Sequence, residues 1–138
     1  MRKIILVMAA VIVASCSSTK NKDTGGLYKV LVSSEYGGGN FQFYEIITDP
    51  KEFNLLLGDE ELKKMVKADD INTSNFVLLN MGEKATGGYS IEVVNVEELP
   101  DKIVVTVKEN KPSGVATTAI TNPYTVVKIN SKKPIEIK

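Results

Sequence analysis

Few side chains in this sequence could carry out catalysis or bind a metal. The chain has one cysteine, Cys16, and no histidine, which excludes Ser-His-Asp and Cys-His nucleophilic sites and zinc sites built on those residues. The tightest acidic clusters, Asp59-Glu60-Glu61 and Asp69-Asp70, lack the alternating spacing of a calcium-binding loop, and we interpret them as charges at helix ends and in loops. The sequence therefore predicts a protein that is not an enzyme, with no catalytic residue, no metal site and no cofactor.

The position of Cys16 indicates a different chemistry, the attachment of a lipid. A basic start, Met1-Arg2-Lys3, precedes an apolar run over residues 4–13 that is too short to span a bilayer. Val13-Ala14-Ser15-Cys16 then resembles the lipobox of bacterial lipoproteins. The resemblance implies that residues 1–15 are a signal peptide, that cleavage precedes Cys16, and that acyl chains such as palmitate on Cys16 hold the protein on a membrane. The alternative is an ordinary secretory signal with an incidental cysteine.

The charge and length of the remaining chain exclude one class of partner and indicate one domain. The full chain has 17 basic and 17 acidic residues, so loss of Arg2 and Lys3 leaves a slight acidic excess. Nucleic-acid binding, which needs a clustered basic face, is not expected. Residues 16–26 are polar and small, as in a flexible tether, and 27–138 fit a single domain. We expect the protein in the bacterial cell envelope, at the outer membrane or the cell surface.

The elements that must position any binding site are mostly strands. Runs of β-type residues with turn signals between them occur at 27–32, 41–47, 76–81, 89–96, 102–108, 124–129 and 134–137, with a weaker candidate at 115–120. Gly37-Gly38-Gly39-Asn40 between the first two runs favours a hairpin. One helical insertion, at about 49–67, begins with Asp49 as a cap and Pro50 in the first turn. The pattern predicts a small, mostly antiparallel β-sandwich or barrel-like domain.

Three motifs in the second half of the chain occur in a recognisable order. Residues 82–93 read GEKATGGYSIEV, 111–114 read KPSG, and 121–129 read TNPYTVVKI. Over about residues 74–130 this set resembles the PrcB C-terminal domain family, in which a hydrophobic strand, a G-x-x-x-TGGY turn, a proline-containing loop and a T-x-PY-x-VV-x-I strand follow one another. Ala85 stands where relatives often carry proline. The family takes its name from a lipoprotein component that associates with a secreted subtilisin-type protease and is credited with stabilising it, so the resemblance implies a protein-binding module for a protease or another envelope protein.

The TGGY turn and the NPY segment are the candidate binding residues. They are Thr86, Gly87, Gly88, Tyr89, Asn122, Pro123 and Tyr124. Chagasin-type cysteine-protease inhibitors place a similar T-T-G-Y loop against the protease, although this chain lacks the arginine and tryptophan of their later loop. Consecutive glycines let another backbone approach closely, and a tyrosine can either pack under such a turn or contact a partner. Three hypotheses remain at this stage. The first is a module that stabilises or regulates a protease, or inhibits one in the manner of chagasin. The second is a structural envelope lipoprotein, and the third is an enzyme with converging carboxylates or a Ser–Lys pair in a cleft, for which the sequence offers no motif.

Overall fold

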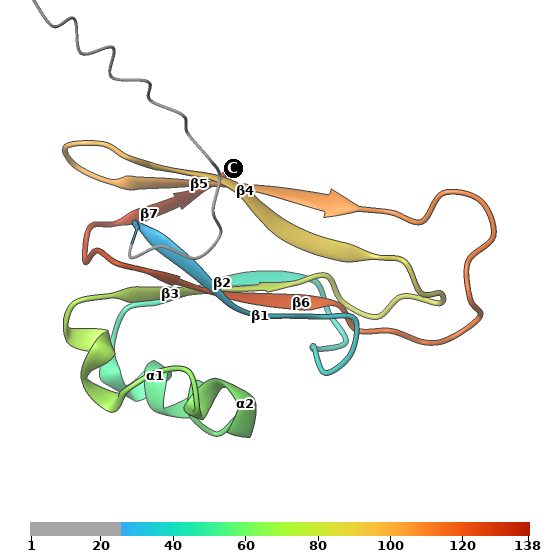
Figure 1. The fold of residues 1–138 in the computed structure, drawn as a ribbon, viewed down its shortest axis with the longest axis horizontal. Helices are drawn as coiled ribbons and strands as arrows, with labels where there is room; N and C mark the ends of the chain where they lie inside the picture. Colours follow the sequence, from blue (N-terminus) through green and yellow to red (C-terminus); the bar gives the residue numbers. More distant parts are fainter. Residues whose placement is uncertain (1–25) are drawn as a thin grey trace, which may run out of the picture.

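The domain is built from two β-sheets and a small helical layer (Figure 1). The computed structural model describes residues 26–138, so Cys16 and the predicted signal peptide lie outside the described residues. One sheet has four strands in the order β1-β6-β3-β2, and the other has three in the order β4-β5-β7. The strands are β1 (Tyr28–Ser34), β2 (Phe43–Ile47), β3 (Asn75–Asn80), β4 (Ser90–Glu98), β5 (Ile103–Asn110), β6 (Tyr124–Ile129) and β7 (Ile135–Ile137).

The inner strands of the four-stranded sheet, β3 and β6, are apolar on both faces because each face is covered by another layer. Val77, Leu79 and Met81 face the second sheet, where they join the core between the sheets. Phe76 faces the other way, into the core beneath the helices. The run at 76–81 that was predicted as a strand is therefore an inner strand, buried on both faces.

The helical layer covers the face of the four-stranded sheet that points away from the second sheet (Figure 1). It consists of α1 (Pro50–Leu56), α2 (Glu60–Lys63) and the 3₁₀ turn η1 (Ala68–Asn72). Asp49 caps α1, since its carboxylate accepts a hydrogen bond from the Glu52 N–H at 2.8 Å, and Asp59 caps α2 in the same manner. The insertion thus begins where it was predicted and ends five residues later, at Asn72 rather than at 67.

Two details of the predicted architecture differ from the structure. The strands form two separate sheets and do not close into a barrel. Of the two predicted alternatives, the structure is therefore the sandwich. The prediction that the first two strands form a hairpin is wrong. β1 pairs with β6 and β2 pairs with β3, so the two strands lie at opposite edges of one sheet. The glycine-rich segment between them crosses the end of that sheet, where the Gly38 N–H donates to the Asn122 carbonyl (2.9 Å) and the Gly39 N–H to the Asn80 side chain (2.9 Å). The second sheet also contains one parallel pair, β5 with β7.

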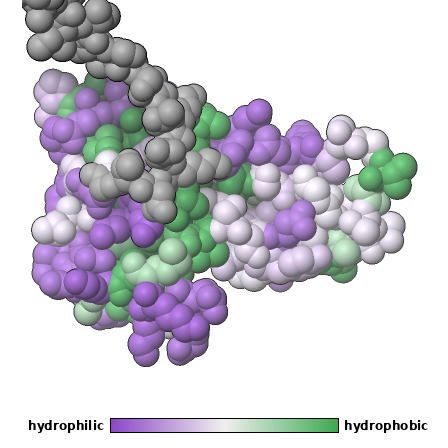
Figure 2. Space-filling model, viewed as in Figure 1, coloured by the Kyte–Doolittle hydropathy of each residue, from purple (hydrophilic) through white to green (hydrophobic). Residues whose placement is uncertain are grey.

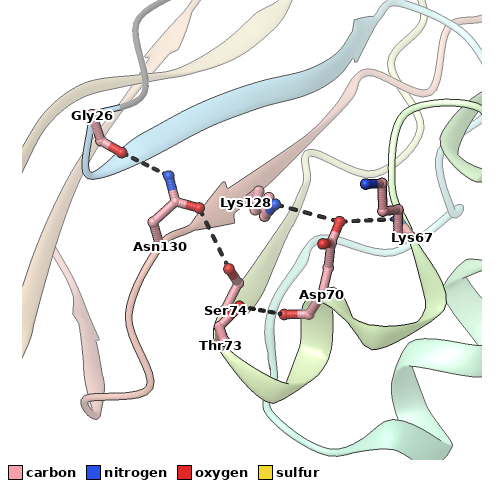
Figure 3. Close-up of polar contacts among 7 residues, drawn as sticks. All are labelled: Gly26, Lys67, Asp70, Thr73, Ser74, Lys128 and Asn130. Carbon is pink, nitrogen blue, oxygen red and sulfur yellow. Dashed lines mark hydrogen bonds and ion pairs between the residues drawn. The ribbon is translucent and has the colours of Figure 1, made fainter.

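Polar contacts hold the start of the described chain at the far end of β6 (Figure 3). The Asn130 side chain donates to the Gly26 carbonyl at 2.6 Å, and its oxygen accepts from Ser74 at 3.4 Å. Nearby, Lys128 of β6 forms an ion pair with Asp70 of η1 at 3.3 Å. Gly26 is therefore fixed at the opposite end of β6 from Tyr124. No helix within residues 26–138 is long and apolar enough to cross a membrane.

Candidate functional site

Three loops meet at the Tyr124 end of β6, on the right of Figure 1. They comprise residues 35–42, 82–89 and 111–123, and we refer to them together as the loop end. Lys84 and Thr121 exchange two backbone hydrogen bonds (2.8 and 2.9 Å), and the Met81 N–H donates to the Pro123 carbonyl at 2.9 Å. The TGGY turn and the NPY segment therefore lie close together, since backbone contacts join the loops that carry them.

The two glycines of the TGGY turn are needed because other segments press against them. The Gly87 N–H donates to the Thr117 carbonyl (3.0 Å) and the Gly88 N–H to the Glu35 carboxylate (2.8 Å). Gly88 has a φ of +88°, and a Cβ placed on it would lie 2.8 Å from the Cβ of Pro112. Any other residue at Gly88 would be strained in its backbone and would also collide with the proline.

Gly38 permits a second close approach within the loop end. A Cβ placed on Gly38 would lie 2.6 Å from the Asn122 carbonyl oxygen and would also collide with the Asn80 side chain. Asn80 is buried and holds this loop through its amide, which donates to the carbonyl oxygens of Gly39 (3.1 Å) and Phe41 (2.5 Å). Residues 35–42 are therefore fastened to the sheet by contacts that an added side chain would break.

The two candidate tyrosines do not share one surface. Tyr89 is half-buried and packs against the core between the sheets, with the Lys84 ammonium 5.3 Å from its ring centre. Tyr124, also half-buried, packs against the core beneath the helices. The direction of Tyr124 follows from the alternation of side chains along β6. Tyr124 and Val126 face the helices, while Thr125 faces the second sheet and donates to the Ile91 carbonyl at 2.6 Å.

The other candidate residues are mostly covered by their own contacts. Gly87 and Pro123 are buried, while Thr86 and Asn122 are half-buried, which leaves Gly88 as the exposed member of the set. Asn122 donates through its side chain to the Asn40 side chain at 3.2 Å, and the Thr86 carbonyl accepts from Thr121 at 2.9 Å. These residues shape the loop end and present little side-chain surface of their own.

The exposed apolar side chains of the loop end lie in two of its loops. Phe41 and Tyr36 are exposed in residues 35–42, and the others lie in the segment that was predicted as a weak strand. Residues 115–120 form an irregular loop, in which Val115 is fully exposed and Ile120 is 65% exposed. Figure 2 shows hydrophobic surface at the far tip of this end, beside mostly neutral surface with hydrophilic patches. The signal available in the sequence was the run of alanine and threonine after Pro112-Ser113-Gly114, which has neither the bulk nor the alternation of a packed strand.

The described part of the chain offers no site for metal chemistry. Among residues 26–138, no group of three or more histidine, cysteine, aspartate or glutamate side chains lies close enough to hold a metal ion. The loop end instead combines a fixed backbone with exposed apolar side chains, an arrangement suited to contact with another protein.

Comparisons with known proteins agree with the resemblance seen in the sequence. Residues 75–130 match the family model described as PrcB C-terminal, which covers β3 to β6 and the last two loops of the loop end. An uncharacterized protein of Methanocaldococcus jannaschii is 30% identical over 67 residues, which are 49% of this chain. The chain spans about two fifths (41%) of the length of that relative. No solved structure matches the chain.

Proposed function

We propose that this chain, whose residues 75–130 match the PrcB C-terminal family, is a non-catalytic, lipid-anchored module of the bacterial cell envelope that binds a protease through its loop end. The observation that carries the binding part is the exposed apolar tip at Val115 and Ile120. Single exposed apolar side chains are common on the surfaces of monomeric proteins. Here two of them, Val115 and Ile120, are exposed on one loop whose two flanks are fastened to the fold, which favours a contact surface.

The loop end is also held in shape before any partner arrives. The Thr117 carbonyl accepts from Gly87, and Thr121 is fully buried and paired with Lys84. The backbone of the 111–123 segment is thus tied on its inner side, while Val115 points into open solvent beyond it. Binding to such a surface costs less conformational entropy than ordering a free loop, so a small apolar contact can still give useful affinity.

We expect Cys16→Ser to abolish membrane attachment. The lipobox resemblance makes the Cys16 thiol the acceptor of the lipid, and serine cannot take its place. Mass spectrometry of the wild-type protein from membranes should show an acylated Cys16 at the N-terminus and no residues 1–15, while the variant should appear as an unacylated protein. A variant that is still processed and membrane-bound in the same amount would overturn the lipid-anchor part of the proposal.

We expect Val115→Asp to weaken binding to the partner by roughly tenfold, because a contact that buries Val115 would have to desolvate the new carboxylate. Folding should be unaffected, since Val115 has no neighbours to lose. The partner is captured from native envelope with the tagged full chain, identified by mass spectrometry, and its affinity is then measured with purified components.

Val94→Asp is the matched control for this experiment, since Val94 lies on β4 and is 42% exposed. The proposal predicts that a protease is recovered, that Val115→Asp weakens its binding, and that Val94→Asp does not. Recovery of envelope proteins without any protease would favour the structural lipoprotein. Equal effects of the two substitutions would remove the binding role from the loop end. The activity of the bound protease would then distinguish stabilisation from inhibition.

A further inference from the structure

A groove opens between the helical layer and the four-stranded sheet, where residues 37–39 of the loop end also line it. Its volume is about 180 Å³. Leu55, Leu56 and Leu62 line it from the helices, and Phe43 and Leu78 line it from the sheet. Leu55 is 81% exposed and Phe43 is 41% exposed, so the mouth of the groove presents apolar surface to solvent. Exposed large apolar side chains that gather around a concave site mark a contact surface.

The groove is negatively charged. Among the described residues that line the groove, Asp59 is the charged one, and none is a lysine or an arginine. Burial raises the pKa of the Tyr124 hydroxyl at the groove, and the negative charges of Asp59 and Glu61 raise it further. The Asp59 carboxylate is fixed in place, because one of its oxygens caps α2 by accepting from the N–H groups of Glu61 (2.8 Å) and Leu62 (3.2 Å). A cationic group beside Asp59 would therefore meet a preorganised negative charge.

The strand beside the groove, β2, is an edge strand. It pairs with β3 and with no other strand of the described chain, so alternate backbone groups along it face away from the sheet. Phe43 and Glu45 of β2 share the face that points to the groove, and Glu45 lies opposite Leu78 in the register. Tyr44 lies on the other face, where its hydroxyl donates to Glu109 at 2.8 Å. No strand of the described chain therefore covers the approach to the groove beside Phe43.

The size of the groove favours a side chain over a small molecule. Pockets for small ligands typically measure about 300–1,000 Å³, whereas this groove is smaller and open on one side. We propose that the groove binds an extended segment of a partner protein, which inserts one large apolar side chain among Leu55, Leu62 and Leu78 and places a lysine or arginine beside Asp59. The groove shares Gly37, Gly38 and Gly39 with the loop end, but it does not include Val115 or Ile120, which carry the proposed protease contact. The inference therefore goes beyond the proposed function and does not depend on it.

The test uses the full chain carrying Cys16→Ser, so that no lipid competes for the groove, and three fluorescent seven-residue peptides. In the first peptide, threonine alternates with leucine, lysine and leucine, which places all three on one face of a strand. The second replaces lysine with glutamate, and the third replaces both leucines with alanine. Fluorescence polarisation should show saturable binding of the lysine peptide, and binding at least tenfold weaker for each of the other two.

Two helix caps provide a matched pair of variants. Asp59→Asn should keep the cap, since asparagine caps as well as aspartate does, while it removes most of the preference for lysine over glutamate. Asp49→Asn makes the same change at the cap of α1, outside the groove, and should leave that preference unchanged. Leu55→Ala should weaken the lysine peptide several-fold, whereas Val115→Asp should leave its binding unaltered.

Several results would overturn the proposal. These are the absence of saturable binding, equal preferences in Asp59→Asn and Asp49→Asn, and an alanine peptide that binds as well as the leucine peptide. Displacement of the lysine peptide by laurate, with laurate affinity independent of Asp59, would assign the groove to acyl chains instead. Because none of these measurements involves the protease, their outcome is independent of the binding experiment with Val115→Asp.

Discussion

Phe76→Ala is expected to lower the free energy of unfolding by about 3–5 kcal/mol, the range typical of a fully buried phenylalanine truncated to alanine. Phe76 is 0% exposed, at the centre of the core beneath the helices. Its ring stacks on Phe53 of α1, with ring centres 4.6 Å apart. Such an aromatic pair stabilises the fold beyond the contribution of its buried area. The substitution therefore removes apolar volume and also the main aromatic contact between α1 and the sheet.

Chemical denaturation of the full chain measures this loss, and Phe41→Ala is the control. Phe41 is 83% exposed, so the same change there should alter the free energy of unfolding by less than about 0.5 kcal/mol. If Phe76→Ala cost less than about 1 kcal/mol, the helical layer would not be packed on the sheet as described.

The second large effect is expected at Leu79, which faces the core between the two sheets and is 0% exposed. Leu79→Ala should cost about 2–5 kcal/mol, because the rigid strands on either side cannot collapse into the cavity. Leu78→Ala makes the same change one residue earlier on the opposite face, where Leu78 is half-buried at the groove. It should cost about half as much, since the apolar area withdrawn from water is smaller.

Thermal or denaturant unfolding of the two leucine variants compares them directly. The difference between neighbouring residues depends on the alternation of faces along β3. A larger loss at Leu78 than at Leu79 would show that the register of β3 is shifted by one residue, because such a shift exchanges the two faces.

Much of the secondary structure could be predicted because its signals are local. The continuous apolar run of β3 marked an inner strand, and Asp49 with Pro50 marked the start of α1. The pairing of β1 could not be predicted in the same manner. Its partner, β6, lies almost a hundred residues away, and a glycine-rich loop is equally compatible with a hairpin and with a crossing over the end of a sheet.

For the candidate site, the sequence predicted the course of the backbone but not the directions and contacts of the side chains. The consecutive glycines at 87 and 88 indicated a close approach, but nothing local could identify Thr117 and Pro112 as the segments that approach. The sequence also did not indicate which of the two layers the Tyr124 side chain faces. Because β6 is apolar on both faces, its alternation does not reveal which face belongs to the helices and which to the second sheet.

The contact between Gly26 and Asn130 has a consequence for how the protein would stand on a membrane. It places the entry of the chain at one end of β6, while the loop end lies at the other (Figure 1). With a lipid on Cys16 as proposed, the ten residue steps from Cys16 to Gly26 allow Gly26 to rise at most about 35 Å above the bilayer, even when fully extended. The height and tilt of the domain would then be limited from the Gly26 side alone, and the tip at Val115 could swing through the aqueous phase. A protease dissolved in that phase could reach it without touching the lipid surface.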